Sequence, residues 1–276
     1  MGRRWLITGC SSGLGRALAT AAARAGDQLA VTARKTADLA ELSAAWPDRV
    51  IPVPLELRDT ASCEEAVRIA ADRLGGIDVL VNNAGVGLFG AVEEVSDHEL
   101  RDQLETFLVG PWRLTRLVLP LMRAQGHGHI INVSSVVGRM AYPGLGAYVA
   151  AKHALEGMSQ ALAIEAAPHN IRVTVLEPGM FATRYGTSLV QARHRVAEYD
   201  VTNREMLDGM RGLAENPETG HPDDYAATVL AIAAAEGPTP LRIPVGDDAY
   251  GHLDAAEQAY REEYAAARRL VRRPPH

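Results

Sequence analysis

The 276-residue sequence has few cysteines, no excess of positive charge and no long apolar run. Its two cysteines are Cys10 and Cys63, and Cys10 lies in a glycine-rich stretch, so we expect no structural disulfide and a reduced, cytoplasmic protein. The net charge of −6 argues against nucleic acid as the main partner, because phosphate binding requires a basic face. No stretch resembles the core of a signal peptide or reaches the about 18 apolar residues of a membrane span, so we expect no membrane partner.

Hydrophobic residues make up 47% of the chain, which is enough for a sizeable core. Short apolar runs alternate with stretches of helical periodicity, which predicts βαβ units and a parallel sheet in an α/β protein. The predicted strands are Arg4–Thr8, Gln28–Thr32, Val50–Leu55, Val79–Asn82, His129–Val133, Arg172–Leu176 and Leu241–Val245. We expect one domain over residues 1–250, followed by a C-terminal helical extension over 251–276 that contains an amphipathic helix, Asp254–Arg269.

The first predicted strand runs into a glycine-rich turn and then a helix. Glycines at positions 9, 13 and 15 permit a tight turn and the close approach of a pyrophosphate, which the N-terminus of a helix favours. The alternative is a turn that only packs the helix on the strand. The residues expected to form a dinucleotide site here are Gly9, Ser11, Ser12, Gly13, Leu14 and Gly15.

The end of the second predicted strand indicates which dinucleotide binds. A site for NAD usually offers a carboxylate here to the ribose hydroxyls, whereas this chain has Ala33 followed by Arg34 and Lys35. Arg34 can pair with a 2′-phosphate, so NADP(H) is favoured over NAD(H). An ordinary solvated arginine is the alternative.

Tyr148 and Lys152 stand four residues apart, a spacing that places both side chains on one face of a helix. An ammonium beside a phenol is expected to lower the pKa of the tyrosine below its usual ~10. A tyrosine tuned in this way can act as an acid or base near neutral pH.

These features together resemble the short-chain dehydrogenase/reductase family over roughly residues 3 to 250. The motifs that carry the resemblance follow one another in a highly specific order. They are Thr8 to Gly15, Asn82-Asn83-Ala84-Gly85, Ser135 thirteen positions before Tyr148, the pair Tyr148 and Lys152, and Pro178-Gly179-Met180-Phe181-Ala182-Thr183. The resemblance implies a doubly wound, mostly parallel seven-stranded sheet with helices on both faces.

The resemblance also implies roles for individual residues. Tyr148 is the expected acid or base, Lys152 tunes it and binds the nicotinamide ribose, and Ser135 hydrogen-bonds the substrate oxygen. No metal ligand is expected. The residues expected to contact the cofactor in this half of the chain are Asn83, Ala84, Gly85, Tyr148, Lys152, Pro178, Gly179 and Thr183.

Two positions depart from the family pattern. Glu56 replaces an aspartate near the adenine, where Glu56 and Leu57 are expected to contact the cofactor. Phe107 replaces an asparagine whose main-chain carbonyl holds a water of the proton relay. Because Pro111 has no N–H, the carbonyl of Phe107 loses its helical partner and can still hold that water. Alternatively, Phe107 packs into the core and the relay is broken.

Two segments concern the substrate. Ser96 to Glu99 is typical of a capping box, and the helix that it starts should kink at Gly110-Pro111. The segment 180–222 is long, mixed in charge and without a clean strand, as is typical of a lid or binding loop. The candidates for the pocket wall, each of which is equally compatible with packing, are Met140, Tyr142, Tyr185, Leu189 and Tyr199.

The sequence therefore predicts an NADPH-dependent carbonyl reductase, or the reverse alcohol dehydrogenase, that acts on a small molecule. The family commonly forms dimers or tetramers, so a homodimer or homotetramer is expected. Phe107 keeps two alternatives open: a cofactor-binding regulator or scaffold with weak or no redox activity, and non-redox chemistry in the same pocket. Intact Ser135, Tyr148 and Lys152 favour the reductase.

Overall fold

The computed structural model describes residues 2–216, 218–237 and 239–271. Seven strands, all parallel, form one sheet in the order β3-β2-β1-β4-β6-β7-β9. The strands are β1 (Arg4–Ile7), β2 (Gln28–Ala33), β3 (Val50–Pro54), β4 (Val79–Asn82), β6 (Gly128–Val133), β7 (Ile171–Pro178) and β9 (Arg242–Val245). The predicted doubly wound sheet is confirmed, and each predicted strand is present with its ends shifted by no more than two residues.

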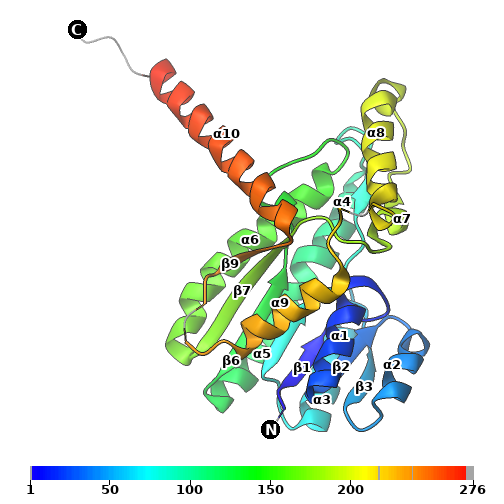
Figure 1. Ribbon diagram of the computed structural model, residues 1–276, viewed down its shortest axis with the longest axis vertical. Coiled ribbons are helices and arrows are strands. Elements are labelled where there is room, and N and C mark those ends of the chain that lie inside the picture. Colours follow the sequence, from blue (N-terminus) through cyan, green and yellow to red (C-terminus); the bar gives the residue numbers. More distant parts are fainter. Residues whose placement is uncertain (1, 217, 238, 272–276) are drawn as a thin grey trace.

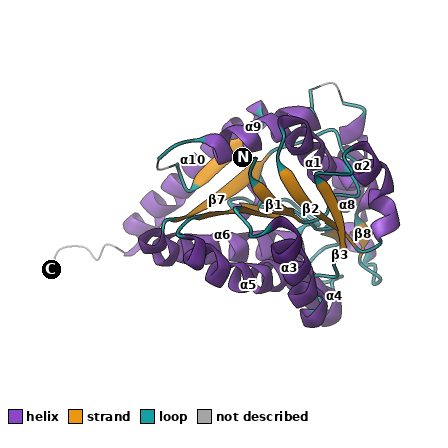
Figure 2. Cartoon of the chain, turned by 90° about the horizontal axis from the view of Figure 1, so that it is seen from below, coloured by secondary structure: helices purple, strands orange, loops and turns teal. Residues whose placement is uncertain are grey.

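Helices cover both faces of the sheet (Figure 2). One face carries α1 (Gly13–Ala25), α2 (Ala40–Ala45) and α9 (Pro222–Ala234), and the other carries α3 (Thr60–Leu74), α4 (Asp97–Leu104), α5 (Gly110–Gln125) and α6 (Gly146–Ala166). Alternate residues of one strand enter different cores: Trp5 and Ile7 pack under α1 and α9, and Leu6 packs under α3 and α5. Burial on both faces explains why the strands are nearly continuous apolar runs.

The strand order reverses beside β1, which lies between β2 and β4. The chain winds outward from β1 to β3 and then returns to start β4 on the other side of β1. In open α/β sheets, ligands bind at the carboxyl ends of the strands next to such a switch point. The loops that follow β1, β4, β6 and β7 all lie at this end of the sheet.

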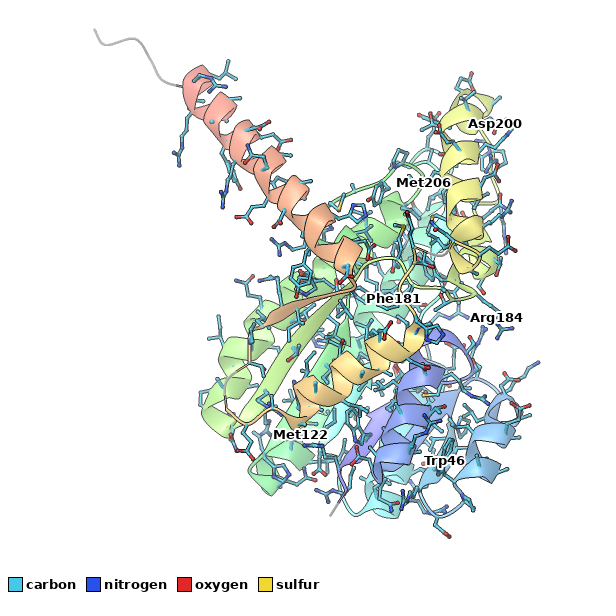
Figure 3. All side chains as sticks on the ribbon, in the orientation of Figure 1. Trp46, Met122, Phe181, Arg184, Asp200 and Met206 are labelled. Carbon is cyan, nitrogen blue, oxygen red and sulfur yellow. The ribbon has the colours of Figure 1, made fainter. Side chains whose placement is uncertain are left out.

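The segment between β7 and α9 stands above the same end of the sheet, where Phe181, Arg184 and Met206 are found (Figure 3). The ends of this segment are tied together, because Gly220 N donates to Met180 O at 3.0 Å and Ala182 N donates to Gly220 O at 2.9 Å. Its elements include α7 (Tyr185–Ser188), β8 (Val190–Gln191) and α8 (Asp200–Arg211). The two-residue strand β8 pairs with β5 (Leu88–Phe89), so the expectation of no clean strand is wrong only at this short pair.

The helix predicted to start at Ser96 is interrupted, although not where we expected. Ser96 and Glu99 form the predicted capping box in front of α4. The interruption is a π-helical turn, η2 (Glu105–Val109), which precedes α5. In this turn Gly110 N donates to Glu105 O, five residues back. Because Pro111 has no N–H, the regular α-helical pattern cannot continue through it, and the extra residue is absorbed one turn earlier.

The final helix, α10 (Asp247–Val271), projects from the body of the protein (Figure 1). It includes the predicted Asp254–Arg269 and begins seven residues earlier. Ala249 and Leu253, in its first two turns, are buried, whereas Leu270 near its end is 87% exposed. Among the described residues, no helix has the length and apolar character needed to cross a bilayer.

Candidate active site

The loop between β1 and α1 forms a glycine cradle. Gly9 and Gly13 have φ angles of 74° and 57°, which favour glycine. A Cβ atom on Gly9 would lie 2.7 Å from the Cα atom of Ala84, so a larger residue does not fit against the loop that follows β4. The cradle therefore leaves the backbone open to the close approach of a phosphate group at the N-terminus of α1.

Thr8 joins this cradle to the loop after β4. Its Oγ1 atom accepts hydrogen bonds from the N atoms of Asn83 and Ala84, both at 2.9 Å. The side-chain amide of Asn83 donates to the carbonyl oxygen of Thr8, also at 2.9 Å. The glycine-rich turn and the loop after β4 are thus one structural unit, and Thr8 is a positioning residue that the sequence did not single out.

A cavity of about 990 Å³ opens from this unit along the carboxyl ends of the strands. It is lined by all the residues that the sequence predicted for the cofactor and for catalysis. These are Gly9, Ser11, Ser12, Gly13, Leu14, Gly15, Arg34, Glu56, Leu57, Asn83, Ala84, Gly85, Ser135, Tyr148, Lys152, Pro178, Gly179 and Thr183. The glycine cradle and the elongated cavity fit a dinucleotide.

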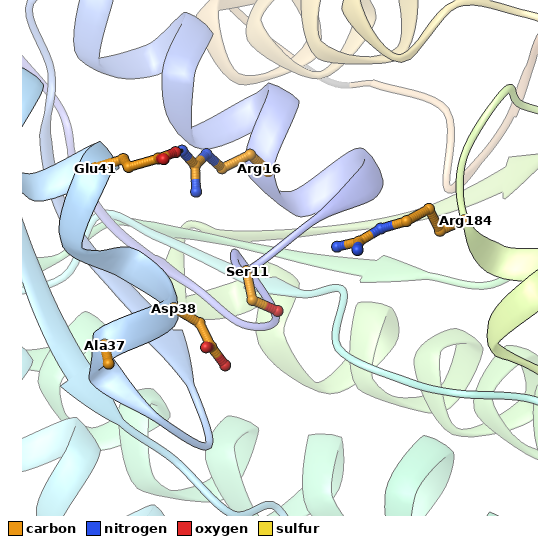
Figure 4. Close-up of a pocket in the computed structure, with 6 residues that line it drawn as sticks. All are labelled: Ser11, Arg16, Ala37, Asp38, Glu41 and Arg184. Atoms are coloured by element: carbon orange, nitrogen blue, oxygen red, sulfur yellow. The ribbon is translucent and has the colours of Figure 1, made fainter.

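A smaller cavity beside the cradle shows two arginines that differ in their surroundings (Figure 4). Arg16 of α1 forms an ion pair with Glu41 at 3.0 Å. Arg184 of the 180–222 segment points its guanidinium toward the loop that carries Ser11. Arg184 lines both cavities, so it can hold an anion at the cradle from above. Sequence reasoning missed Arg184, and the available signal was its position directly after Thr183.

Ser135, Tyr148 and Lys152 reach the cavity from two elements. Ser135 caps a 3₁₀ turn, η3 (Val136–Gly138), by accepting a hydrogen bond from Val137 N at 3.3 Å. Its hydroxyl also lies 3.5 Å from the carbonyl oxygen of Pro178, to which it donates. Tyr148 and Lys152 lie one turn apart on α6, and both side chains are buried.

The ammonium of Lys152 bonds to a strand carbonyl and lies 5.5 Å from the centre of the Tyr148 ring. Its Nζ atom donates to Val133 O at 2.7 Å and lies 4.3 Å from the centre of the Phe107 ring. Burial lowers the pKa of Lys152 to about 7, and the charge of Glu156 opposes this shift. The pKa of Lys152 is therefore close to neutral pH.

The pKa of Tyr148 is raised, so the expectation that Lys152 would lower it is wrong for this arrangement. Burial is the main cause, and the hydroxyls of Tyr185 and Ser135 oppose it. The physical reason is that the phenol enters an apolar cluster, while the ammonium bonds to a strand carbonyl instead. A phenol in this state is protonated at neutral pH and can donate a proton.

Phe107 fills the space between Lys152 and the loop after β4. Its side chain is 4% exposed and meets the Tyr148 ring edge-on, with the ring centres 5.1 Å apart. A Cβ atom on Gly85 would overlap the Phe107 ring, so only glycine leaves room there. Phe107 therefore packs into the core, as one of the two alternatives from the sequence has it. Whether its carbonyl holds a relay water stays a prediction.

Of the five side chains predicted as candidates for the pocket wall, some line the cavity and others do not. Tyr142 and Tyr185 line the cavity. Met140 and Leu189 pack in neighbouring apolar clusters, and Tyr199 is a surface residue whose hydroxyl donates to Glu93.

The two histidines at the start of β6 take structural positions. The exposed His127 contacts Asp78, and the buried His129 contacts the hydroxyl of Thr174. Within the part of the chain that the structure describes, no group of His, Cys, Asp and Glu side chains has an arrangement that could hold a metal ion.

Comparison with known proteins identifies the family. Residues 3–194 match the short chain dehydrogenase family. The chain is 37% identical to Oxidoreductase BOA17 of Botryotinia fuckeliana over 95% of its length and 98% of that protein. It superposes on a short-chain dehydrogenase from Streptomyces avermitilis with a TM-score of 0.89 and 38% identity, covering 98% and 97% of the two chains. An alcohol dehydrogenase of Thermococcus sibiricus in complex with 5-hydroxy-NADP gives a TM-score of 0.72 and 28% identity, covering 89% and 96%. The chain is therefore an oxidoreductase that belongs to the short-chain dehydrogenase/reductase family.

Proposed function

We propose that the protein is an NADPH-dependent reductase that converts the carbonyl group of a bulky, apolar small molecule into an alcohol, or catalyses the reverse reaction. The observation that carries this proposal is the meeting of Ser135, Tyr148 and Lys152 with the predicted cofactor residues in one cavity. When bound, the nicotinamide supplies or accepts the hydride.

The three side chains suit the remaining steps. Tyr148 is protonated because burial raises its pKa, so it donates a proton to the carbonyl oxygen. The hydroxyl of Ser135 hydrogen-bonds the same oxygen and stabilises its developing charge. Lys152 binds the nicotinamide ribose.

The preference for NADP(H) rests on the end of β2. Ala33 is buried and offers no carboxylate to the ribose hydroxyls, while Arg34 is exposed and lines the cavity. A guanidinium here suits a 2′-phosphate. Arg34→Ala should weaken NADPH binding about tenfold or more and leave NADH binding nearly unchanged, as measured by cofactor fluorescence. Equal losses for both cofactors would contradict the preference.

The proposed substrate follows from the opposite end of the cavity. The cavity is lined by polar side chains such as Gln103 and Glu205, and by apolar and aromatic side chains from three separate parts of the chain. The apolar and aromatic ones include Val86, Leu88, Tyr142, Leu145, Met206 and Met210. Such a wall favours an apolar body that carries one carbonyl group.

Phe107 favours a second candidate, a cofactor-binding regulator or scaffold with little turnover. We propose instead that the main-chain carbonyl of Phe107 holds a relay water, since Pro111 has no N–H to bond that carbonyl. The absence of a water between the Phe107 carbonyl and Lys152 in a high-resolution crystal structure with cofactor would overturn this relay.

NADPH oxidation against a panel of ketones and aldehydes tests the proposed activity. We expect turnover of bulky apolar carbonyls, with a loss of at least about 100-fold in Tyr148→Phe. Tyr199→Phe is the matched control, because Tyr199 lies at the surface away from the cavity. NADPH binding without turnover of any carbonyl would favour the regulator.

A further inference from the structure

Tyr185 brings a second phenol against Tyr148. The two ring centres are 5.8 Å apart and the ring planes are tilted by 46°. Tyr185 is the first residue of α7, and its backbone N donates to Thr183 Oγ1 at 3.2 Å. The backbone of Gly186 packs directly against that of Met210 in α8. The 180–222 segment therefore carries this phenol to the Tyr148 ring.

The hydroxyl of Tyr185 is buried and has no hydrogen-bond partner of normal geometry among residues 2–216, 218–237 and 239–271. It lies close to Gly87, where a Cβ atom would overlap it. A buried hydroxyl without a partner is unfavourable, and an acceptor that forms next to it is stabilised. The hydroxyl also lies beside the cavity, which Tyr185 lines.

The remaining groups around Tyr148 are mostly apolar, and two polar groups also lie there: the Ser135 hydroxyl and the Lys152 ammonium, which is 5.5 Å from the ring centre. Phe107, Val136, Val137, Ala249 and Leu253 pack in the same apolar cluster. Of the polar groups, the Ser135 hydroxyl bonds to Pro178 O and Val137 N, and Lys152 donates to Val133 O, with Glu156 behind it. Tyr142, also in this cluster, contacts His252 through its hydroxyl.

We propose that Tyr185 is a positioning residue whose hydroxyl donates a hydrogen bond to the Tyr148 oxygen and stabilises the phenolate formed during reduction. The inference rests on the proposed role of Tyr148. The Tyr148 O–H bond breaks as the new O–H bond forms on the substrate oxygen. Tyr185 keeps its own proton throughout, and its hydrogen bond strengthens because a phenolate is a better acceptor than a phenol.

The electrostatics of the two phenols support this order of events. Burial and the neighbouring Tyr148 raise the pKa of Tyr185 well above the ordinary value of 10. Tyr185 therefore remains the donor while Tyr148 ionises. Tyr185 therefore adds a donor from the 180–222 segment to the polar groups that η3 and α6 place near Tyr148.

The test reads the ionisation of Tyr148 directly and needs no substrate. A trifluorotyrosine placed at position 148 of the full-length protein lowers the intrinsic pKa of that phenol, and ¹⁹F NMR follows its titration alone. In Tyr185→Phe, the titration midpoint should rise by about one pH unit, the tenfold change that a hydrogen bond to a charged group carries. Tyr199→Phe, on the same segment, should leave the midpoint unchanged.

An unchanged midpoint in Tyr185→Phe would overturn the inference, even if Tyr148→Phe abolishes reductase activity. A shifted midpoint in a protein without reductase activity would support the phenol pair while contradicting the proposed function. Tyr185→Phe should fold, because it keeps the buried ring and its volume and removes only the hydroxyl. Thermal unfolding of both variants checks this.

Discussion

At the scale of single residues, Phe107 decides the surroundings of the candidate proton donor. Its ring lies under the ammonium of Lys152, beside Tyr148 and against Gly85. One aromatic side chain thus contacts the lysine and shapes the wall next to the tyrosine. The same contacts make this residue important for folding as well as for chemistry.

Phe107→Asn should therefore lower the free energy of unfolding by about 3–5 kcal/mol, since a buried aromatic ring is replaced by a small polar group. If the relay runs through the main chain, turnover per folded molecule should change by less than about tenfold. Chemical denaturation and NADPH oxidation check the two parts. Phe107→Leu controls for the loss of the ring without a buried amide. A rise in turnover of about 100-fold in Phe107→Asn would show that the missing amide limits the rate.

The lowered pKa of Lys152 leads to a second prediction, which concerns how the free energy of unfolding depends on pH. Its pKa is about 7 in the folded chain and rises to the ordinary 10.5 on unfolding. Between these values the unfolded chain binds more protons, so the contribution of Lys152 to the free energy of unfolding increases as the pH rises and is constant below about 7. The slope is at most about 1.4 kcal/mol per pH unit.

Denaturation of wild type and Lys152→Met at several pH values between neutral and 10 should show a smaller slope in the variant. Lys35→Met is the matched control, because Lys35 is exposed and should leave the slope as in wild type. Parallel slopes in wild type and Lys152→Met would contradict the lowered lysine pKa.

At the scale of elements, α10 contributes unevenly along its length. Leu253 is 7% exposed and packs in the cluster that contains Tyr148, whereas Leu270 is 87% exposed. Leu253→Ala should lower the free energy of unfolding by about 2–3 kcal/mol, and Leu270→Ala should leave it within about 0.5 kcal/mol. Urea denaturation of the two variants provides the comparison, and equal effects would mean that the helix packs along its whole length.

The elements also show which parts of the molecule the sequence could predict. The strands were predictable because burial on both faces makes each one a short apolar run, and the glycine cradle because its backbone angles demand glycine at fixed positions. The π-helical turn could not be predicted. Pro111 indicates that the helix breaks, but the contact of Phe107 with Gly85 joins residues far apart in the sequence and has no local signal. The orientation of Lys152 depends on Val133 O in the same way.

Arg184 and Tyr185 were missed as functional residues for a related reason. Tyr185 was only a candidate for the pocket wall, and nothing in the local pattern of the 180–222 segment shows that it folds back over the cradle. That arrangement needs the contacts between Met180 and Gly220 at its two ends, which are far apart in sequence.

At the scale of the whole molecule, two exposed apolar side chains lie on neighbouring elements of the fold, α5 and α6. Trp112 of α5 is 54% exposed and Ile164 of α6 is 73% exposed. We expect a homodimer or homotetramer that buries both. Sedimentation velocity should show that Trp112→Glu combined with Ile164→Glu reduces the assembly to monomers, because charges are unfavourable in an interface core. Tyr264→Glu, on the projecting α10, is the control, and it should retain the assembly.

Because Arg184 and Tyr185 are adjacent, cofactor binding and substrate binding should follow a fixed order. One turn of chain carries both the guanidinium that faces the cradle and the phenol that faces Tyr148. Occupation of the cradle by the pyrophosphate should therefore fix the segment before a carbonyl compound can bind productively. We expect a compulsory-order mechanism in which NADPH enters first and NADP⁺ leaves last. Product inhibition by NADP⁺ should be competitive with NADPH, while the alcohol should be noncompetitive with both substrates.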